Sequence, residues 1–152
     1  MNSFEVVKDK HRKFPDRKIT MPLRGSNMSA GYDLYSNQNI DLEPGTSYVF
    51  WTDIKCKLNY GNVLMLFPRS SMGIKKKIMI GNTVGIIDAD YYNNKDNDGN
   101  IAVCLYNYGT TSVPIANGER IAQAVIVKHD RVNSGYTLLK KEREGGIGST
   151  GK

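Results

Sequence analysis

The sequence predicts an all-β fold of the sandwich or barrel class, and three features of the chain point to it. Glycine, proline and asparagine interrupt the 152 residues at short intervals. Between these breaks the apolar segments are short and rich in β-branched residues, as core strands are. No long segment carries the 3.6-residue apolar period of a helix. Many short strands at such spacing are typical of a sandwich or a barrel.

Individual segments support this fold class. Residues 52–58 alternate between apolar and charged side chains, which is the period of a half-buried strand. The apolar positions are Ile54, Cys56 and Leu58, and the charged positions are Asp53, Lys55 and Lys57. Continuous apolar runs predict core strands at residues 63–67, 78–80, 101–105 and 124–127. At most one or two helical turns are expected, after Ser70.

Length and composition predict one compact domain. Hydrophobic residues make up 39% of the chain and charged residues 24%, and both fractions are ordinary for a globular protein. No apolar run approaches the length of about 20 residues that a membrane span requires. Residues 1–18 lack the apolar stretch of a signal peptide. We therefore expect a soluble, cytoplasmic protein with no membrane partner.

The net charge of +6 comes from the two ends of the chain. Residues 1–18 and residues 128–152 each carry six basic and three acidic side chains. Such ends either remain solvated or attract a polyanion such as a nucleotide. No basic stripe is interleaved with aromatic residues, so nucleic-acid binding is not expected.

Other segments resemble known phosphate-binding or metal-binding motifs but lack residues or elements that those motifs require. Residues 146–152 match the glycine-rich part of a P-loop, but no helix follows them in this sequence to hold phosphates. Residues 94–99 resemble the start of a calcium loop, yet Leu105 stands where the bidentate glutamate is needed. We expect this segment to be a polar hairpin tip, with Asp98-Gly99 as its turn. Cys56 and Cys104 have no metal-ligand spacing and are expected to be reduced.

The remaining candidates lie in loops that contain glycine, serine and carboxylates. AGYDL places Asp33 in a tight turn, and PRSS offers a guanidinium and two hydroxyls that suit phosphate. Asp88 follows a further apolar run, and the C-terminal Gly/Ser/Thr segment has backbone N–H groups that can wrap an anion. The segments are residues 30–34, 68–71, 81–91, 118–123 and 145–151.

In this order and spacing, the segments resemble the five motifs of the trimeric dUTPase family. The most specific pieces are AGYDL (30–34), PRSS (68–71), GIIDADY (85–91) and GSTG (148–151). The resemblance implies a jelly-roll-like β-fold and a homotrimer whose active sites are each assembled from several subunits. It also implies Mg²⁺-dependent hydrolysis of dUTP to dUMP and pyrophosphate, which limits uracil in DNA and supplies dUMP for dTMP synthesis.

The resemblance also implies roles for the matching residues. Asp88 would orient and deprotonate the water that attacks the α-phosphorus, since this reaction needs a positioned base and no protein nucleophile. Asp33 would support a hydrated Mg²⁺ through water, because Mg²⁺ binds mainly through the substrate phosphates. The residues that would hold phosphate oxygens are Arg69, Ser70, Ser71 and Gln123.

The nucleoside end of the site follows from the same resemblance. Asn82 and the backbone of the 91–101 hairpin would read the uracil edges, with Gly85 also in the substrate site. Tyr91 would pack under the deoxyribose and exclude a ribose 2′-hydroxyl by its bulk. The β-domain would span residues 1–142, and residues 143–152 would form a flexible arm that closes over the triphosphate. The contributing arm residues would be Arg143, Ser149 and Thr150.

Departures from the family pattern affect the arm and the hairpin. Arg143 is shifted by one place, and Ile147 replaces the phenylalanine that stacks on the base. The hairpin is longer than usual around residues 93–98, and Glu119 replaces an aspartate. The uracil lid is therefore either a weaker Ile147 or a relocated Tyr92 from the longer hairpin. A plain structural role for Tyr92 is the third possibility.

Two other functions remain open beside dUTP hydrolysis. A dCTP deaminase-like enzyme would share the fold and an Arg-Ser-Ser loop, but that group has a glutamate in place of Asp88 and lacks this GSTG segment. A non-catalytic nucleotide-sensing or partner-binding protein could also retain the fold. The intact Asp88, Tyr91 and C-terminal motif favour catalysis.

Overall fold

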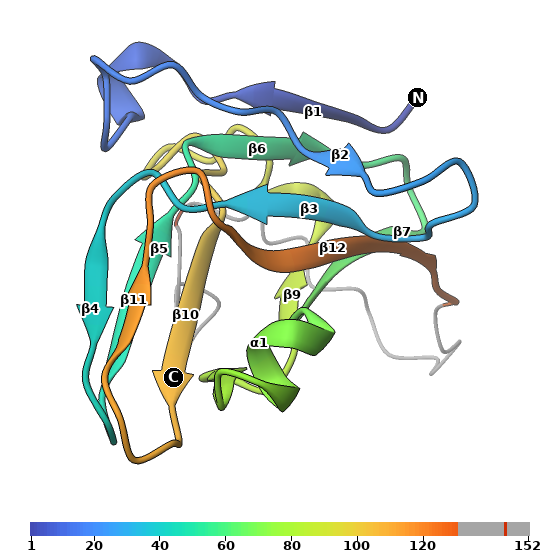
Figure 1. The fold of residues 1–152 in the computed structure, drawn as a ribbon. Coiled ribbons are helices and arrows are strands. Elements are labelled where there is room, and N and C mark those ends of the chain that lie inside the picture. Colours follow the sequence, from blue (N-terminus) through green and yellow to red (C-terminus); the bar gives the residue numbers. More distant parts are fainter. Residues whose placement is uncertain (131–144, 146–152) are drawn as a thin grey trace.

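The computed structural model describes residues 1–130 and residue 145, and it confirms the predicted all-β fold (Figure 1). These residues form twelve short strands, one α-helix and two 3-10 turns. In chain order the elements are β1 (Ser3–Val6), η1 (Asp9–His11), β2 (Leu23–Arg24), β3 (Tyr32–Tyr35), β4 (Ile40–Leu42), β5 (Ser47–Trp51), β6 (Ile54–Lys57), β7 (Asn62–Phe67), α1 (Ser70–Ile74), β8 (Ile78–Ile80), β9 (Gly85–Ile87), η2 (Ala89–Tyr91), β10 (Ala102–Asn107), β11 (Val113–Ile115) and β12 (Arg120–Lys128). The predicted apolar runs lie in or overlap β7, β8, β10 and β12.

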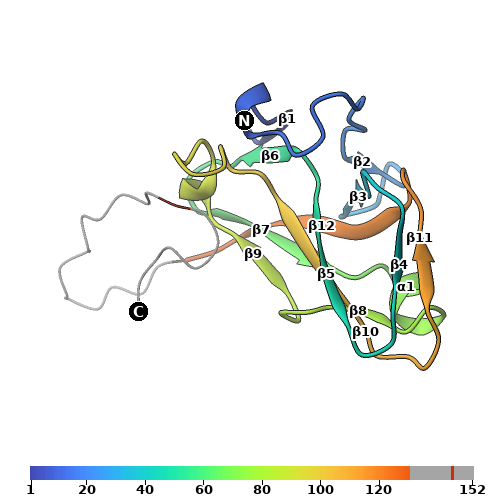
Figure 2. The same cartoon turned by 90° about the vertical axis from the view of Figure 1, so that its left-hand side faces the viewer.

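The strands pair antiparallel in several sheets. The largest sheet has the order β2-β3-β12-β7-β9, and a three-stranded sheet has the order β5-β10-β8. Two further pairs, β11-β4 and β1-β6, complete the described part of the chain. Figure 2 shows the long β12 running beside β7, with β10 and β5 crossing in front of them. No helix among the described residues is long and apolar enough to span a membrane.

β12 is the strand on which the largest sheet is organised. Its Gln123 pairs with Asp33 of β3 on one side and with Phe67 of β7 on the other. Ile121 and Ala124 are fully buried, so the strand contributes to the core. The same register therefore joins the end of β7, the turn into β3 and the GERIAQ segment, which are three of the motifs singled out in the sequence.

The alternating segment forms a strand at residues 54–57, as predicted, but two of its three charged residues are buried, and only Lys57 is exposed. Asp53 is completely buried and Lys55 is 4% exposed. The carboxylate of Asp53 accepts hydrogen bonds from the backbone N–H groups of Lys13 (2.8 Å) and Phe14 (2.9 Å). The solvated face is lost at these two positions because the N-terminal segment covers Asp53, and the 92–100 loop covers Lys55, whose Nζ donates to Asn93 (2.7 Å) and Asp98 (2.8 Å).

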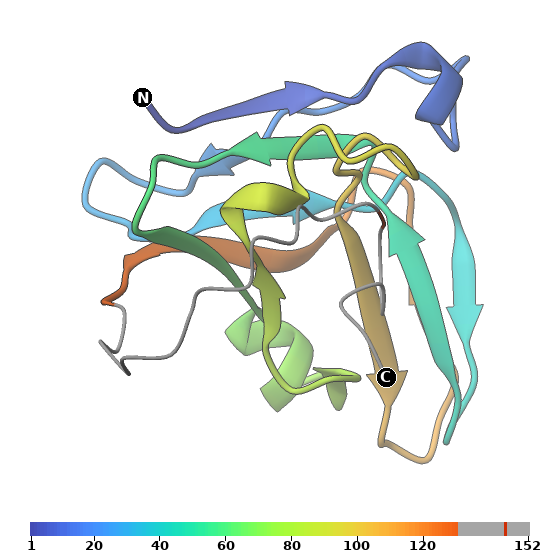
Figure 3. The same cartoon turned by 180° about the vertical axis from the view of Figure 1, so that it is seen from behind.

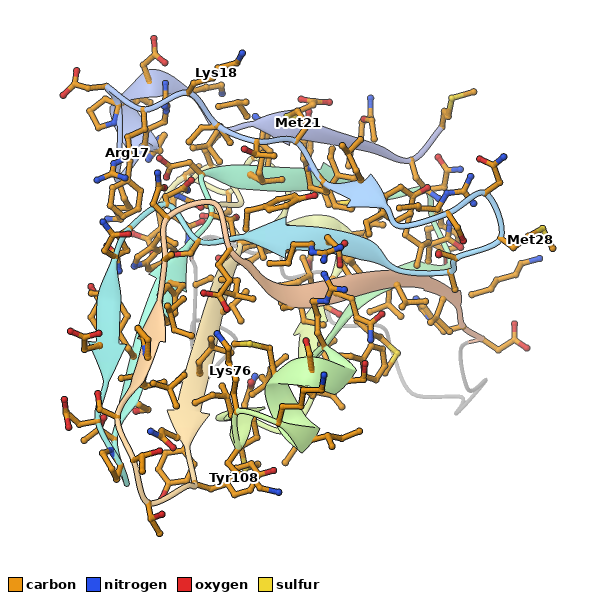
Figure 4. The ribbon with its side chains drawn as sticks, in the orientation of Figure 1. Arg17, Lys18, Met21, Met28, Lys76 and Tyr108 are labelled. Atoms are coloured by element: carbon orange, nitrogen blue, oxygen red, sulfur yellow. The ribbon has the colours of Figure 1, made fainter. Side chains whose placement is uncertain are left out.

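The N-terminal segment is docked on the fold, although five of its six basic residues are exposed. Val7 N–H donates to the carbonyl of Asp53 at 3.0 Å, and the guanidinium of Arg12 lies 3.8 Å from the Asp53 carboxylate. Arg17 and Lys18 lie at the outer edge of the segment in Figure 4. Two basic side chains of this segment lie near buried carboxylates, Lys8 at 3.4 Å from Asp98 and Arg12 at 3.8 Å from Asp53.

The predicted hairpin after Tyr91 is not a strand ladder. β9 pairs with β7, whereas β10 pairs with β5 and β8, so the two strands that flank the segment are not neighbours. The expected turn is present, because Asp98 and Gly99 both have positive φ (59° and 85°) and Asn100 N–H bonds the carbonyl of Asn97 at 3.0 Å. The connection is a compact loop, since its polar side chains bond one another and β6.

Asp98 links this loop to β6 and to the N-terminal segment. Its carboxylate accepts hydrogen bonds from Lys55 Nζ and from the backbone N–H of Lys8, each at 2.8 Å. Burial opposes ionisation of Asp98, but these hydrogen bonds and the two lysine charges outweigh it and lower its pKa. The charged form is therefore the one that the folded protein stabilises.

The short helix α1 is fixed at the opposite end of the molecule. Tyr108, just beyond β10, donates its hydroxyl to the carbonyl of Gly73 at 2.6 Å (Figure 4). Lys76, which follows the helix, forms an ion pair with Glu119 before β12. These contacts hold the start of the helix, with its exposed serines, against the end of the five-stranded sheet.

The stability of the fold should fall with acid, partly through Asp98. A lowered folded pKa makes the carboxylate stabilising above its ordinary value of 3.8, and this contribution is lost as pH falls through the folded pKa. Asp98→Asn should therefore have a lower free energy of unfolding than the wild type at pH 6. This difference between the two proteins should be smaller at pH 3, as measured by urea denaturation. Asp41→Asn, at an exposed position of β4, is the control that should keep the wild-type slope. If Asp98→Asn is less stable than the wild type by the same free energy at pH 6 and at pH 3, the stabilising role of the ionised Asp98 is contradicted.

Candidate active site

A pocket of about 470 Å³ opens between the β8–β9 connection and β10. Three residues predicted from the sequence line it, namely Asn82, Gly85 and Tyr91. Its walls are otherwise mostly apolar, with Leu66 of β7 and Val103 of β10 among them. An apolar pocket with a few polar groups is suited to a flat, partly polar ligand.

Glycines give the pocket its shape because backbone strands approach closely there. A Cβ atom at Gly81 would lie 2.9 Å from Cys104 Sγ, and one at Gly85 would lie 3.0 Å from Leu66 Cβ. Both distances are shorter than ordinary van der Waals contact. The glycines therefore serve close packing of β9 and its loop against β7 and β10.

Tyr91 forms one wall of the pocket and is held by its hydroxyl. The side chain is 5% exposed, and its hydroxyl donates to the carbonyl of Asn100 at 2.9 Å. Asn97 Nδ2 donates to the Tyr91 hydroxyl oxygen at 2.8 Å. Asn97 and Asn100 were not predicted as site residues. The signal for them was the density of asparagine in the segment, which indicates a self-bonded turn as well as a polar tip.

A second group of predicted residues meets at the end of β7. The Asp33 carboxylate lies 3.0 Å from Arg69 Nη1 and 3.4 Å from Arg120 Nη1. Gln123, opposite Asp33 in the sheet, donates from Nε2 to the carbonyl of Pro68 at 3.3 Å. The hydroxyls that follow, on Ser70 and Ser71, are at exposed positions where α1 begins. This cluster, defined as Asp33, Arg69, Ser70, Ser71 and Gln123, offers donors to an anion.

Asp88 is not part of that cluster. It directly follows Ile87, which pairs with Leu64 near the start of β7. Arg69 lies beyond the other end of β7, five residues after Leu64, which corresponds to about 17 Å of extended chain. Asp88 is exposed and borders a separate hollow with Asn62 and His129. One copy of the chain thus holds the carboxylate and the phosphate-binding cluster at opposite ends of one strand.

The donor set suits a hydrated metal ion and not a caged one. Among residues 1–130 and 145, no group of three or more His, Cys, Asp or Glu side chains is placed to hold a metal. Both oxygens of Asp33 face guanidinium groups, which disfavours direct ligation of a cation there. A hydrated Mg²⁺ held mainly by a triphosphate fits this arrangement, because it needs few protein ligands.

Comparison with known proteins decides the family. A dUTPase family model matches residues 17–151. The chain belongs to the dUTPase family. It is 36% identical over 151 residues to the deoxyuridine 5′-triphosphate nucleotidohydrolase of Lactococcus lactis, covering 99% of this chain and 98% of that protein.

Solved structures of dUTPases share its fold. The crystal structure of the Streptococcus mutans dUTPase superposes with a TM-score of 0.75 at 32% identity, over 86% of this chain and 98% of that one. A variant of the dUTPase from phage phi11 of S. aureus, in which the coordination of a structural Mg(II) ion was described, superposes with a TM-score of 0.70. It is 21% identical over 93% of this chain and 97% of that one, so it shows the fold.

The dUTPase motif at the C-terminus lies outside the described residues. This applies to the predicted roles of Arg143, Ser149 and Thr150, to the lid role of Ile147 and to the boundary of the flexible arm at residues 142 and 143.

Tyr92 has a position that favours the structural alternative over the uracil lid. Its hydroxyl donates to Glu5 Oε2 at 2.7 Å, and Lys55 Nζ lies 4.9 Å from the centre of its ring. The hydrogen bond to Glu5, followed by burial, raises the pKa of the Tyr92 hydroxyl. Tyr92 therefore ties the loop to β1 and faces away from the pocket that Tyr91 lines.

Removing only the Tyr92 hydroxyl should separate these two roles. Tyr92→Phe should lower the free energy of unfolding by about 1 kcal/mol, the size of one hydrogen bond, and leave the KM for dUTP unchanged. Chemical denaturation and steady-state assays provide the two measurements. Tyr48→Phe, at an exposed position of β5, is the matched control for stability. A raised KM with unchanged stability would restore Tyr92 as part of the lid.

Proposed function

We propose that the chain hydrolyses dUTP to dUMP and pyrophosphate with Mg²⁺, by attack of a water molecule that Asp88 activates. The observation that carries the proposal is the pocket formed by Asn82, Gly85 and Tyr91, which occurs in a dUTPase-family chain together with the phosphate-binding cluster. The proposed reaction limits uracil in DNA and supplies dUMP for dTMP synthesis, and its expected location is the cytoplasm.

The pocket would bind the nucleoside. The Asn82 side chain and backbone groups near it would bond the uracil edges, while the apolar walls cover the ring faces. Tyr91 would lie under the deoxyribose and leave no room for a 2′-hydroxyl. Gly85 supports this role by letting β9 pack directly on Leu66, which keeps the pocket narrow.

The cluster at the end of β7 would bind the triphosphate. Arg69 supplies a charged donor, Ser70 and Ser71 supply hydroxyls, and Gln123 supplies an amide donor. Asp33 would hold Arg69 in place and reach the hydrated metal through water. Mg²⁺, when bound, neutralises phosphate charge and stabilises the charge that develops on the leaving group. The description of a structural Mg(II) ion in the phage phi11 enzyme supports this cofactor.

Asp88 would act as the general base. It is exposed at the end of β9, beside the 3-10 turn that carries Tyr91, so a water near it would be close to a ligand in the pocket. Because phosphoryl transfer needs a positioned water and charge neutralisation, a carboxylate at this place is sufficient without a covalent intermediate.

The separation along β7 implies that copies of the chain share each site. Asp88 follows β9 near the start of β7, and Arg69 lies beyond its other end, about 17 Å of extended chain away, so one copy does not bring the proposed base beside the proposed phosphate donors. A second copy that presents its cluster to the first one's pocket resolves the distance, and a closed ring of three copies satisfies every site equally. The C-terminal residues Arg143, Ser149 and Thr150 would close the assembled site.

A substrate panel tests this function. The purified protein is incubated with dUTP, dCTP, dTTP and UTP in the presence of Mg²⁺, and pyrophosphate and ammonia are measured. Pyrophosphate from dUTP, with little from the other nucleotides, is the expected result. Ammonia released from dCTP would identify a deaminase, and no turnover of any nucleotide would favour a binding protein.

The role of Asp88 has its own test. Asp88→Asn keeps the shape of the side chain but removes its basicity, so kcat for dUTP should fall by about 10² to 10⁴-fold. Binding of dUTP, measured by calorimetry, should change little. Asp41→Asn on β4 serves as the control for carboxylate removal at an exposed strand position. An Asp88→Asn protein with near wild-type kcat would refute the assignment.

A further inference from the structure

The loop between η2 and β10, residues 92–100, directly follows Tyr91 (yellow in Figure 3). It is unusually well buried for a polar segment. Four of its polar residues are nearly inaccessible, with exposed fractions of 6% for Asn94, 9% for Asn97, 1% for Asp98 and 0% for Asn100. Burying so many amides and a carboxylate is costly unless every group is bonded. The bonds that they make converge on Tyr91.

Tyr91 is held at both ends by this loop. At the tip of the ring, its hydroxyl donates to the Asn100 carbonyl at 2.9 Å and accepts from Asn97 Nδ2 at 2.8 Å. At the backbone, the Tyr91 carbonyl accepts from Asn94 Nδ2 at 2.8 Å. The tip bonds control the ring most strongly, because they act farthest from the Cα atom about which the side chain turns.

The orientation of the Asn97 amide is fixed by its neighbours. Its Oδ1 accepts hydrogen bonds from Asn94 Nδ2 at 2.8 Å and from the backbone N–H of Gly99 at 3.0 Å. Since both partners are donors, Oδ1 must face them and Nδ2 must face the Tyr91 hydroxyl. Asn97 is therefore a directed donor to Tyr91.

The loop itself is anchored to the rest of the fold. Asn100 Nδ2 donates to the buried carboxylate of Asp53 at 2.9 Å, and Asp98 bonds Lys55 at 2.8 Å. Gly99 is required for the close fit, because a Cβ atom there would lie 2.9 Å from the carbonyl oxygen of Tyr91. Asn97 is therefore held in place by the rest of the fold, and its hydrogen bond restrains the Tyr91 ring.

We propose that Asn97 is a positioning residue for Tyr91 and that it contributes to the discrimination between deoxyribose and ribose in the pocket. This inference rests on the proposed function of the pocket. Discrimination against one added hydroxyl depends on a wall that does not yield, and a shift of about 1 Å in the ring would admit the larger sugar. Asn97 touches neither substrate nor the reacting atoms in this arrangement, and it acts through the tyrosine hydroxyl.

The test compares selectivity in Asn97→Ala and in a matched control. Asn107→Ala is the control because Asn107 is also buried and makes three hydrogen bonds, to Leu42, Thr111 and Gly109, at the far end of β10. In Asn97→Ala the ratio of kcat/KM for dUTP to that for UTP should fall by about three- to tenfold, the effect of one hydrogen bond. The kcat for dUTP should stay within about twofold, since the base and the phosphate ligands are untouched. Asn107→Ala should lose similar stability in denaturation and retain the wild-type ratio.

A double-mutant cycle with Tyr91→Phe tests whether Asn97 acts through the hydroxyl. Tyr91→Phe should lose as much selectivity as Asn97→Ala, and the double variant should lose no more than Tyr91→Phe. Tyr91→Phe keeps the ring, so it decides the question if Asn97→Ala does not fold. Full selectivity in either single variant, or additive losses in the double variant, overturns the inference. A wild-type protein that leaves dUTP intact overturns the proposed function instead, which is a distinguishable result.

Discussion

The register of β12 between β3 and β7 is the constraint on which the candidate site depends. Gln123 is held opposite Asp33 on one side and Phe67 on the other. Side chains alternate across a strand, so a slip of one residue would turn the buried Ala122 and Ala124 toward the opposite face of the sheet. The apolar core therefore fixes the register, and the register in turn places Arg69 beside Asp33.

The antiparallel pairing of β7 with β9 has the opposite consequence for Asp88. Because β9 runs back along β7, the residues that follow β9 lie near the start of β7, while Arg69 lies beyond its end. Asp88 is thus separated from the phosphate-binding cluster by most of the length of β7, whereas Gly85 of the pocket pairs with Leu66, near the end of β7 that leads to the cluster. Under the proposed function, this separation of Asp88 from Arg69 is the physical reason for a site shared between copies.

Local patterns in the sequence predicted five of the strands (β6, β7, β8, β10 and β12) and the short helix after Ser70, while the candidate site residues came from the resemblance to the dUTPase motifs. The apolar runs in β7 and β10 and the turn at Asp98-Gly99 are local signals, and each appears in the structure. The burial of Asp53 and Lys55 was not predictable in this way. Their alternation with apolar residues is that of a solvated face, and they are buried by long-range contacts, Asp53 with the N-terminal segment and Lys55 with the 92–100 loop.

The loop that follows Tyr91 shows the same difference between local and long-range information. Its length and polarity suggested a hairpin. Strand pairing, however, depends on which strands are neighbours in the fold, and β10 pairs with β5 and β8 and not with β9. The supporting bonds from Asn97 and Asn100 depend on that arrangement. The separation of Asp88 from Arg69 also required the observed register, since the motifs give the residues but not their distances.

The central claim, that each active site is shared between copies of the chain, is tested most directly by complementation. Asp88→Asn and Arg69→Gln proteins are each expected to be nearly inactive, and they are then co-refolded in equal amounts and assayed with dUTP. Random mixing gives half of the sites an intact base and half of those an intact Arg69 from another copy, so activity should return to about one quarter of the wild-type value. A mixture that stays at the level of the separate variants would show that both residues act from the same copy and would contradict the account.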